Sequence, residues 1–127
     1  MSATGRATQV VSALYDFFSG FGLDAYAEGS APTGAAPPYI TVQLIVPETL
    51  GETVGFYARV WYRSKSFEAL NAKVDEIDAA IGPGAVVRTE GGAIWIYKDS
   101  PFMQYMPYEG DDTLKCAYLR MKLGADV

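Results

Sequence analysis

The hydrophobic positions near the N-terminus repeat with the period of a helix. They recur at steps of three and four residues, as on a helix with one side facing a core, and they are Ala7, Val10, Val11, Leu14, Phe17, Phe18 and Phe21. Gly20 and Gly22 are helix-terminating residues. The pattern predicts an amphipathic helix over residues 5 to 20. A short extended segment, Leu23 to Tyr26, and a Gly- and Pro-rich loop over 28 to 38 are expected to follow.

The next two segments have the composition of strands. Tyr39 to Val46 is β-branched and aromatic and has a proline on each side. Thr53 to Tyr62 alternates between two faces, one made of Val54, Phe56, Ala58, Val60 and Tyr62 and the other of Tyr57, Arg59, Trp61 and Arg63. A short turn joins the two segments, so the sequence predicts a hairpin.

A second helix and further strands complete the chain. The helix has a narrow apolar stripe, formed by Phe67, Leu70, Val74, Ile77 and Ile81, and it ends at Gly82-Pro83-Gly84. Ala85 to Thr89 and Ala93 to Lys98 predict another hairpin. Thr113 to Leu123 alternates as a last strand. Because of its prolines, the segment 100–112 is predicted to be irregular, although it is rich in aromatic residues and methionine.

The order helix, strands, helix, strands predicts an α+β fold. We expect two helices packed on one face of a mostly antiparallel sheet. The alternating strands suit a sheet whose other face is not covered by helices of the same chain. A length of 127 residues fits one domain, spanning 1–127.

The composition of the chain then excludes several classes of function. The chain has no histidine, which excludes His-based catalytic triads and His-ligated metal sites, and its single cysteine, Cys116, excludes an intrachain disulfide. Ten basic against fifteen acidic residues give a net charge of −5, opposite to what phosphate binding favours. No apolar run approaches the about 18 residues of a membrane span, and Asp16 interrupts the early apolar stretch, unlike a signal peptide. We expect a soluble, unexported protein without membrane contact that is not an enzyme.

The candidate chemical motifs have simpler structural explanations. Gly20, Gly22 and Ala25 fit the spacing G-x-G-x-x-A, but a helix precedes them where a dinucleotide site needs a strand. The densest acidic cluster, Glu109, Asp111 and Asp112, lacks the ligand pattern of an EF-hand and is expected to be a solvated turn. Cys116 is expected to be a packed thiol. We therefore predict no catalytic residue, no cofactor and no metal site.

A surface for partners is the more unusual expectation. Aromatic residues, methionine and arginine together are typical of interface cores, and the candidate interface residues are Tyr57, Arg59, Trp61, Arg63, Phe102, Met103, Tyr105, Met106, Tyr108 and Tyr118. Two arrangements are open. The segment 101–108 folds over the second sheet face, or neighbouring copies of the chain cover that face, and both can be partly true.

These elements together resemble a known family. The N-terminal helix leads through a loop to Pro37-Pro38-Tyr39-Ile40, a hairpin ends in Val60-Trp61-Tyr62-Arg63-Ser64, and the next helix begins with Phe67-Glu68-Ala69-Leu70. Over about residues 7 to 123 this order resembles the tail terminator, or tail-completion, proteins of long-tailed bacteriophages. The aromatic segment 101–108 has no counterpart in the family pattern.

The resemblance implies a structural protein. Members of this family form homohexameric rings that cap the tail tube, stop its polymerisation and form the surface that joins the head. The implied partners are the chain itself, the tail tube protein and head–tail connector proteins, with DNA passing through the lumen and no sequence-specific nucleic acid binding. The implied location is the tail or neck of the virion, and the host cytoplasm during assembly. Alternatives are another neck or head-completion protein and a small-molecule-binding α+β domain.

Overall fold

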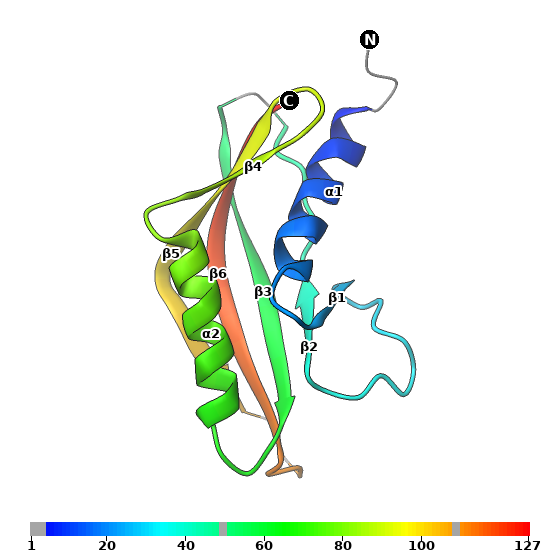
Figure 1. Cartoon of the computed structure of the whole chain (residues 1–127), viewed down its shortest axis with the longest axis vertical. Helices are drawn as coiled ribbons and strands as arrows, with labels where there is room; N and C mark the ends of the chain where they lie inside the picture. The colour runs from blue at the N-terminus through cyan, green and yellow to red at the C-terminus, as the bar shows by residue number, and fades with distance from the viewer. Residues whose placement is uncertain (1–4, 49–50, 108–109) are drawn as a thin grey trace.

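The computed structural model describes residues 5–48, 51–107 and 110–127, and it contains two helices and one six-stranded sheet (Figure 1). The elements in chain order are α1 (Arg6–Ser19), β1 (Asp24–Ala27), β2 (Tyr39–Val42), β3 (Thr53–Arg63), α2 (Glu68–Ile81), β4 (Ala85–Arg88), β5 (Ala93–Met106) and β6 (Leu114–Asp126). The strand order is β1-β2-β3-β6-β5-β4. Among the described strands, β1 and β2 pair in parallel, and the other neighbouring strands pair antiparallel.

The sheet is built around the long central pair of β3 and β6. These strands pair over the whole of β3, from Thr53 opposite Gly124 to Arg63 opposite Leu114. Their alternation is the one that the sequence predicts, because Phe56, Ala58 and Val60 of β3 are buried in the core. The residues between them lie on the opposite face of the sheet.

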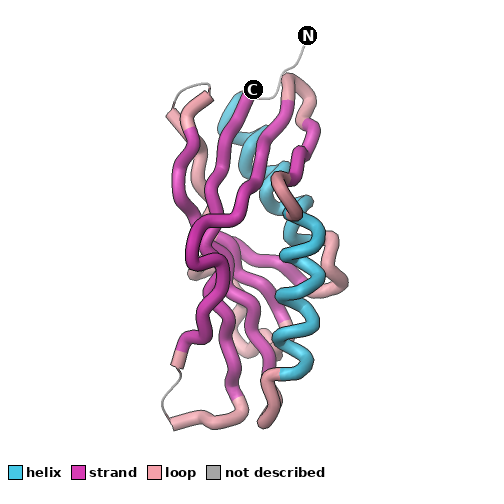
Figure 2. Tube along the Cα trace, turned by 90° about the vertical axis from the view of Figure 1, so that its left-hand side faces the viewer, coloured by secondary structure: helices cyan, strands magenta, loops and turns pink. Residues whose placement is uncertain are grey.

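Both helices cover the same face of the sheet (Figure 2). Helix α2 packs on β3, β5 and β6. Helix α1 packs on β1 and β2 at one edge and on β4 and β5 at the other, so the sheet curls around it (Figure 1). Side chains fix this position, since Gln9 Oε1 accepts a hydrogen bond of 2.7 Å from the Gly91 N–H and Arg6 donates to the carbonyl oxygens of Val127 and Pro47.

The core lies between the helices and this face. Its largest fully buried side chains come from all layers, and they are Phe18, Leu14, Ile40, Leu70, Ile77, Ile81, Ile94, Ile96, Leu119, Met121, Leu123 and Val10. The predicted α+β arrangement of two helices on one face of a mostly antiparallel sheet is confirmed. The two predicted helices and the two predicted hairpins are also present.

The prediction that residues 100–112 are irregular is wrong for their first half. Strand β5 continues to Met106, and its register on β6 shifts between Lys98 and Met103. Pro101 lies in this irregularity, where a strand accommodates a residue that has no N–H to donate. The proline therefore interrupts the ladder without ending the strand.

Strand lengths also differ from the prediction. The strand expected over 39–46 stops at Val42, and the following apolar residues, Leu44 to Val46, pack against the core without regular pairing. The last strand runs three residues further than Leu123, to Asp126. Within the described ranges, neither helix is long and apolar enough to cross a membrane.

Candidate functional site: the open sheet face

The face of the sheet that points away from the helices, here called the open face, carries a continuous set of aromatic and basic residues. The register of β3 on β6 places Tyr57 opposite Arg120, Arg59 opposite Tyr118 and Trp61 opposite Cys116. Their sequence neighbours Ala58, Val60, Ala117 and Leu119 are buried in the core on the helix side. The period of two therefore sends these six side chains to the open face.

Two tyrosines and an arginine form the centre of this face. The Tyr57 and Tyr118 rings are stacked, with centroids 4.9 Å apart and planes at 20°. The Arg59 guanidinium lies 5.4 Å from the Tyr57 centroid and 5.8 Å from the Tyr118 centroid. Each contact falls within the range of a cation–π interaction. The planar groups stabilise one another and present a preorganised surface.

Trp61 extends this surface toward β2 and β1. Its ring lies 6.2 Å from Tyr39, and Tyr39 in turn lies 5.7 Å from Tyr26. The Trp61 Nε1–H donates to Thr41 Oγ1 at 3.1 Å. We call Tyr39, Tyr57, Arg59, Trp61 and Tyr118 the aromatic–arginine cluster.

An acidic residue beside the cluster orients it. Thr41 is only 4% exposed and donates its hydroxyl to Glu28 Oε2 at 3.2 Å. The same carboxylate oxygen lies 3.7 Å from Arg59 Nε, an ion-pair distance that is too long for a hydrogen bond. Glu28, Thr41 and the cluster thus form one connected polar and aromatic network across three strands.

Only part of the predicted interface comes together. Tyr57, Arg59, Trp61 and Tyr118 share the open face, and Arg63 lies at its end, where it pairs with Asp111. Phe102 and Met103 pack against the core instead, and Tyr105 contacts Phe67 at the helix side. Met106 is opposite Cys116 at an open-face position, and Tyr108 lies outside the described residues.

The proposal that the segment 101–108 folds over the second sheet face is therefore wrong for its described residues. Residues 101 to 106 are part of the sheet itself. Tyr105 and Phe67 have ring centroids 4.2 Å apart, and the Tyr105 hydroxyl donates to Asn71 Oδ1 at 2.5 Å. Lys115 lies 5.0 Å from the Phe67 ring. These contacts anchor the end of β5 to the start of α2.

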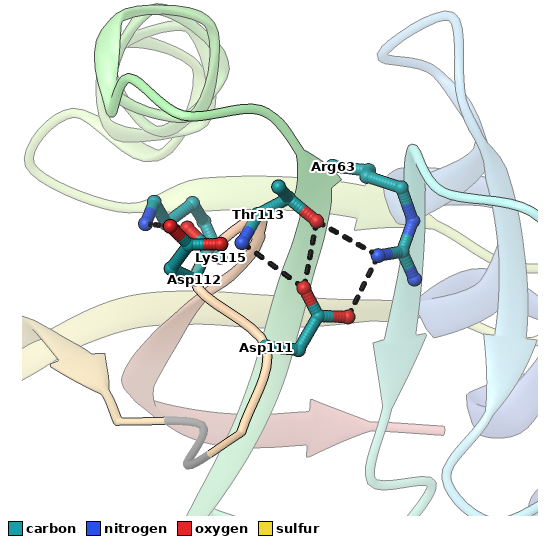
Figure 3. A network of polar contacts seen from close by, with 5 residues as sticks. All are labelled: Arg63, Asp111, Asp112, Thr113 and Lys115. Carbon is teal, nitrogen blue, oxygen red and sulfur yellow. Dashed lines mark hydrogen bonds and ion pairs between the residues drawn. The ribbon is translucent and has the colours of Figure 1, made fainter.

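The acidic turn has a structural role that the sequence did not suggest (Figure 3). Asp111 accepts hydrogen bonds from Arg63 Nη1 at 2.8 Å, from Thr113 Oγ1 at 2.7 Å and from the Thr113 N–H at 3.0 Å. The hydrogen bond from Arg63, followed by those from Thr113, holds the pKa of Asp111 well below its ordinary value. Asp112 contributes its backbone carbonyl, which accepts from Lys115 Nζ, and Glu109 lies outside the described residues.

Cys116 is a packed thiol, as predicted. It is 1% exposed although its strand position points to the open face, between Trp61 and Met106 in the register. Burial raises the pKa of this thiol to about 12. Such a thiol is a poor nucleophile at neutral pH.

Sequence reasoning missed the residues that β1 and β2 add to the face. Tyr26 pairs with Thr41, and Tyr39 with Trp61, through the parallel β1–β2 ladder and the β2–β3 hairpin. The alternation of Tyr39 and Thr41 with buried Ile40 and Val42 is the signal that could have placed them on the open face.

The chemistry of the open face lies in its aromatic and polar contacts. Among the residues that the structure describes, no group of three or more acidic or cysteine side chains is placed to hold a metal ion. The open face instead combines stacked rings, a half-buried guanidinium and a buried hydrogen-bond network. In comparisons with known proteins, no family model matches the chain and no curated protein matches its sequence.

Proposed function

We propose that this chain is a structural subunit of a bacteriophage tail terminator, which forms a homohexameric ring, caps the tail tube and joins it to the head. The observation that carries the proposal is the open face. There the Tyr57–Tyr118 stack and Arg59 form a preorganised patch on the side of the sheet without helices. Tyrosine, tryptophan and arginine are the residues that contribute most to binding at protein interfaces.

The remaining features support an assembly protein. Without a histidine the chain lacks the commonest general base. A net charge of −5 suits a lumen through which DNA slides, because like charges avoid strong phosphate contacts. A ring forms when one heterologous interface repeats and its rotation closes. The proposed partners are other copies of the chain, the tail tube protein and head–tail connector proteins.

Two measurements test this function. Light scattering coupled to gel filtration should show an oligomer of the 13.7-kDa chain at micromolar concentration. Added to polymerising tail tube protein, the chain should bind tube ends and shorten the tubes seen by electron microscopy. A monomer that leaves tube length unchanged contradicts the proposal. Binding to the head portal without any effect on tubes would favour a neck or head-completion protein instead.

A small-molecule-binding domain is the alternative that one observation favours. A depression of about 260 Å³ between α1 and the β4–β5 turn is lined by polar side chains, including Ser12, Asp16 and Arg88. In its wall, Thr89 Oγ1 is buried without a hydrogen-bond partner among the described residues. Ligand pockets usually hold about 300–1,000 Å³, so this depression supports the alternative less than the open face supports assembly. A strictly monomeric chain that binds a polar metabolite here would favour it.

A further inference from the structure

The sheet has an unpaired stretch of backbone at each of its two sides. β1 is the last strand on one side, and among the described strands it pairs only with β2. On the other side, β4 pairs with β5 only from Ala93 to Ile96. Further along β5, no described strand pairs with residues 103–106 on the side away from β6. Such edges present free backbone N–H and C=O groups, with which a strand of another chain can pair.

The two unpaired stretches lie at the same level of the sheet. The registers of the intervening strands define rows that cross the whole sheet. One row runs from Asp24 of β1 to Met106 of β5, and the row three positions further runs from Ala27 to Met103. The four residues of β1 and residues 103–106 of β5 therefore occupy the same four rows, on opposite sides of the molecule (Figure 1).

The two stretches also run in opposite directions. β1 is parallel to β2, and each step from β2 through β3 and β6 to β5 reverses the direction. β1 and β5 are therefore antiparallel. A second copy in the same orientation, placed beside the first, would bring its β5 antiparallel to β1 at the same level.

The composition of the two stretches favours pairing. Edge strands are commonly protected from other chains by charged residues or proline. Residues 102–106 contain neither, and Asp24 is the one charged residue of β1. Pro101 and Pro107 lie at the two ends of the β5 stretch, and because proline has no N–H to donate, they confine pairing to the residues between them.

Pairing along these rows also keeps the two faces of the sheet in register. Ala25, which is buried on the helix side, shares its row with Tyr105, whose ring contacts Phe67 on the same side. Tyr105 is 41% exposed in the single chain. A shift by one residue would place helix-side residues of one copy beside open-face residues of the other.

We propose that β1 of one copy of this chain pairs antiparallel with residues 103–106 of β5 in a second copy, so that the two sheets join edge to edge. Each copy contributes a different edge, so the contact is heterologous and can repeat. Pairing within the same rows adds no displacement along the strands, which favours a closed ring over a rising filament. The inference rests on the proposed function in that both require self-association. It leaves the aromatic–arginine cluster on the open face available to a different protein.

Crosslinking between single cysteines tests this contact. Asp24→Cys and Met106→Cys place one thiol at each edge in the same row, and the native Cys116 is buried. The two variants are mixed in equal amounts and treated with a short bis-maleimide. A covalent dimer is expected on a denaturing gel, because the strand contact holds the two thiols close together. Either variant alone should give little dimer, and the parent chain is the control for the reagent.

Val86→Cys is the matched control at the other part of the same side of the sheet. Val86 is exposed on β4, which pairs with the first part of β5. Mixed with Asp24→Cys, it should give at least about tenfold less dimer than Met106→Cys does, because the contact does not hold these two thiols together. A chain with both Asp24→Cys and Met106→Cys should give a ladder of linked copies up to the full oligomer. Melting curves confirm that each variant is folded.

Hydrogen exchange tests the same contact without any substitution. As the parent chain associates with rising concentration, the amides of β1 and of residues 103–106 should exchange more slowly, because their edges become paired. The amides of β4 should be unchanged. Association that leaves exchange in β1 and in residues 103–106 unchanged would overturn the inference.

The remaining outcomes separate the inference from the proposed function. A parent chain that assembles, together with a mixture that gives no more dimer than the Val86→Cys control, shows that the inference is wrong while the proposed ring stands. Dimers formed by one variant alone, in the yield of the mixture, show a symmetric contact and also overturn the inference. A parent chain that stays monomeric at every concentration and gives no linked dimer overturns the inference, and binding to tube ends then decides the proposed function on its own.

Discussion

Arg63 and Asp111 join the end of β3 to the turn that precedes β6. The Arg63 Nη1–H donates to Asp111 Oδ2 at 2.8 Å, across 48 positions of sequence (Figure 3). Thr113 donates to the other carboxylate oxygen of Asp111 through its hydroxyl and its backbone N–H. One ionised carboxylate therefore holds the strand end and the turn together.

Asp111 is expected to make part of the stability depend on pH. Its pKa is lowered in the folded chain, chiefly by the hydrogen bond from Arg63, so the unfolded chain takes up a proton first as the pH falls. The stabilisation is complete above the ordinary aspartate pKa of about 4 and is lost as the pH falls toward the lowered value. Urea unfolding at several pH values should show Asp111→Asn less stable than the parent at pH 7 and equal to it at strongly acid pH.

The neighbouring aspartate is the control for this experiment. Asp112→Asn retains the backbone carbonyl that accepts from Lys115, so its unfolding should follow that of the parent at every pH. A difference between Asp111→Asn and the parent that stays constant down to strongly acid pH would show that the charge of Asp111 is not responsible.

Replacing Thr41, a buried polar residue under the open face, is expected to lower the stability of the chain. Its hydroxyl accepts from Trp61 Nε1 and donates to Glu28 Oε2, and the residue is 4% exposed. Thr41→Val keeps the shape but removes both hydrogen bonds in a buried setting, which costs about 1–3 kcal/mol. Urea unfolding followed by tryptophan fluorescence measures the loss.

Thr8→Val is the matched comparison for Thr41→Val. Thr8 is exposed on α1, where substitutions usually change the free energy of unfolding by no more than about 0.5 kcal/mol. Equal effects of the two substitutions would show that the buried hydrogen bonds to Thr41 contribute little.

The helices and the alternation of β3 and β6 were predictable because each follows a local period. Val10, Leu14 and Phe18 recur at helical spacing, and Phe56, Ala58 and Val60 alternate in the strand, and all six are buried as predicted. The open-face positions of Tyr57, Arg59 and Trp61 follow from the same alternation. Features that depend on the residues of one helix or strand alone could therefore be predicted from the sequence.

Contacts between elements that are distant in the sequence could not be predicted in this way. The network of Glu28, Thr41 and Arg59 depends on the parallel pairing of β1 with β2, which no local pattern encodes. Pro101 suggested a break, yet the ladder of β5 on β6 resumes at Met103 beyond a bulge. Likewise, the acidic turn looked solvated because its partner, Arg63, lies on another strand.

Cys116 is expected to be inert in the folded chain. The thiol is 1% exposed and its pKa is raised to about 12 by burial, so almost no thiolate is present at pH 8. A chromogenic disulfide reagent should react only at the rate at which the chain opens, and fully in urea. Complete labelling within seconds in native buffer would contradict this, and Cys116→Ser provides the blank.

We expect the stability of the fold to require glycine at position 92, where the β4–β5 turn meets the end of the chain. A Cβ atom on Gly92 would lie 1.7 Å from the Asp126 carbonyl oxygen and 2.9 Å from its carbonyl carbon. Ala93 pairs with Asp126 in the next position of the ladder, so the backbone cannot move aside without disturbing that pairing. Gly92→Ala should therefore destabilise the chain by about 1–3 kcal/mol, the usual cost of forcing extra volume into a packed site.

Gly55→Ala is the matched substitution, because a Cβ on Gly55 has no atom within 4 Å and the residue lies within β3. With fewer conformations open to the unfolded chain, Gly55→Ala should be neutral or stabilising by up to about 1 kcal/mol. The melting temperature should therefore fall for Gly92→Ala and should stay equal or rise for Gly55→Ala. A Gly92→Ala chain that melts with the parent would show that β5 and the C-terminal end of β6 are not packed as closely as the structure places them.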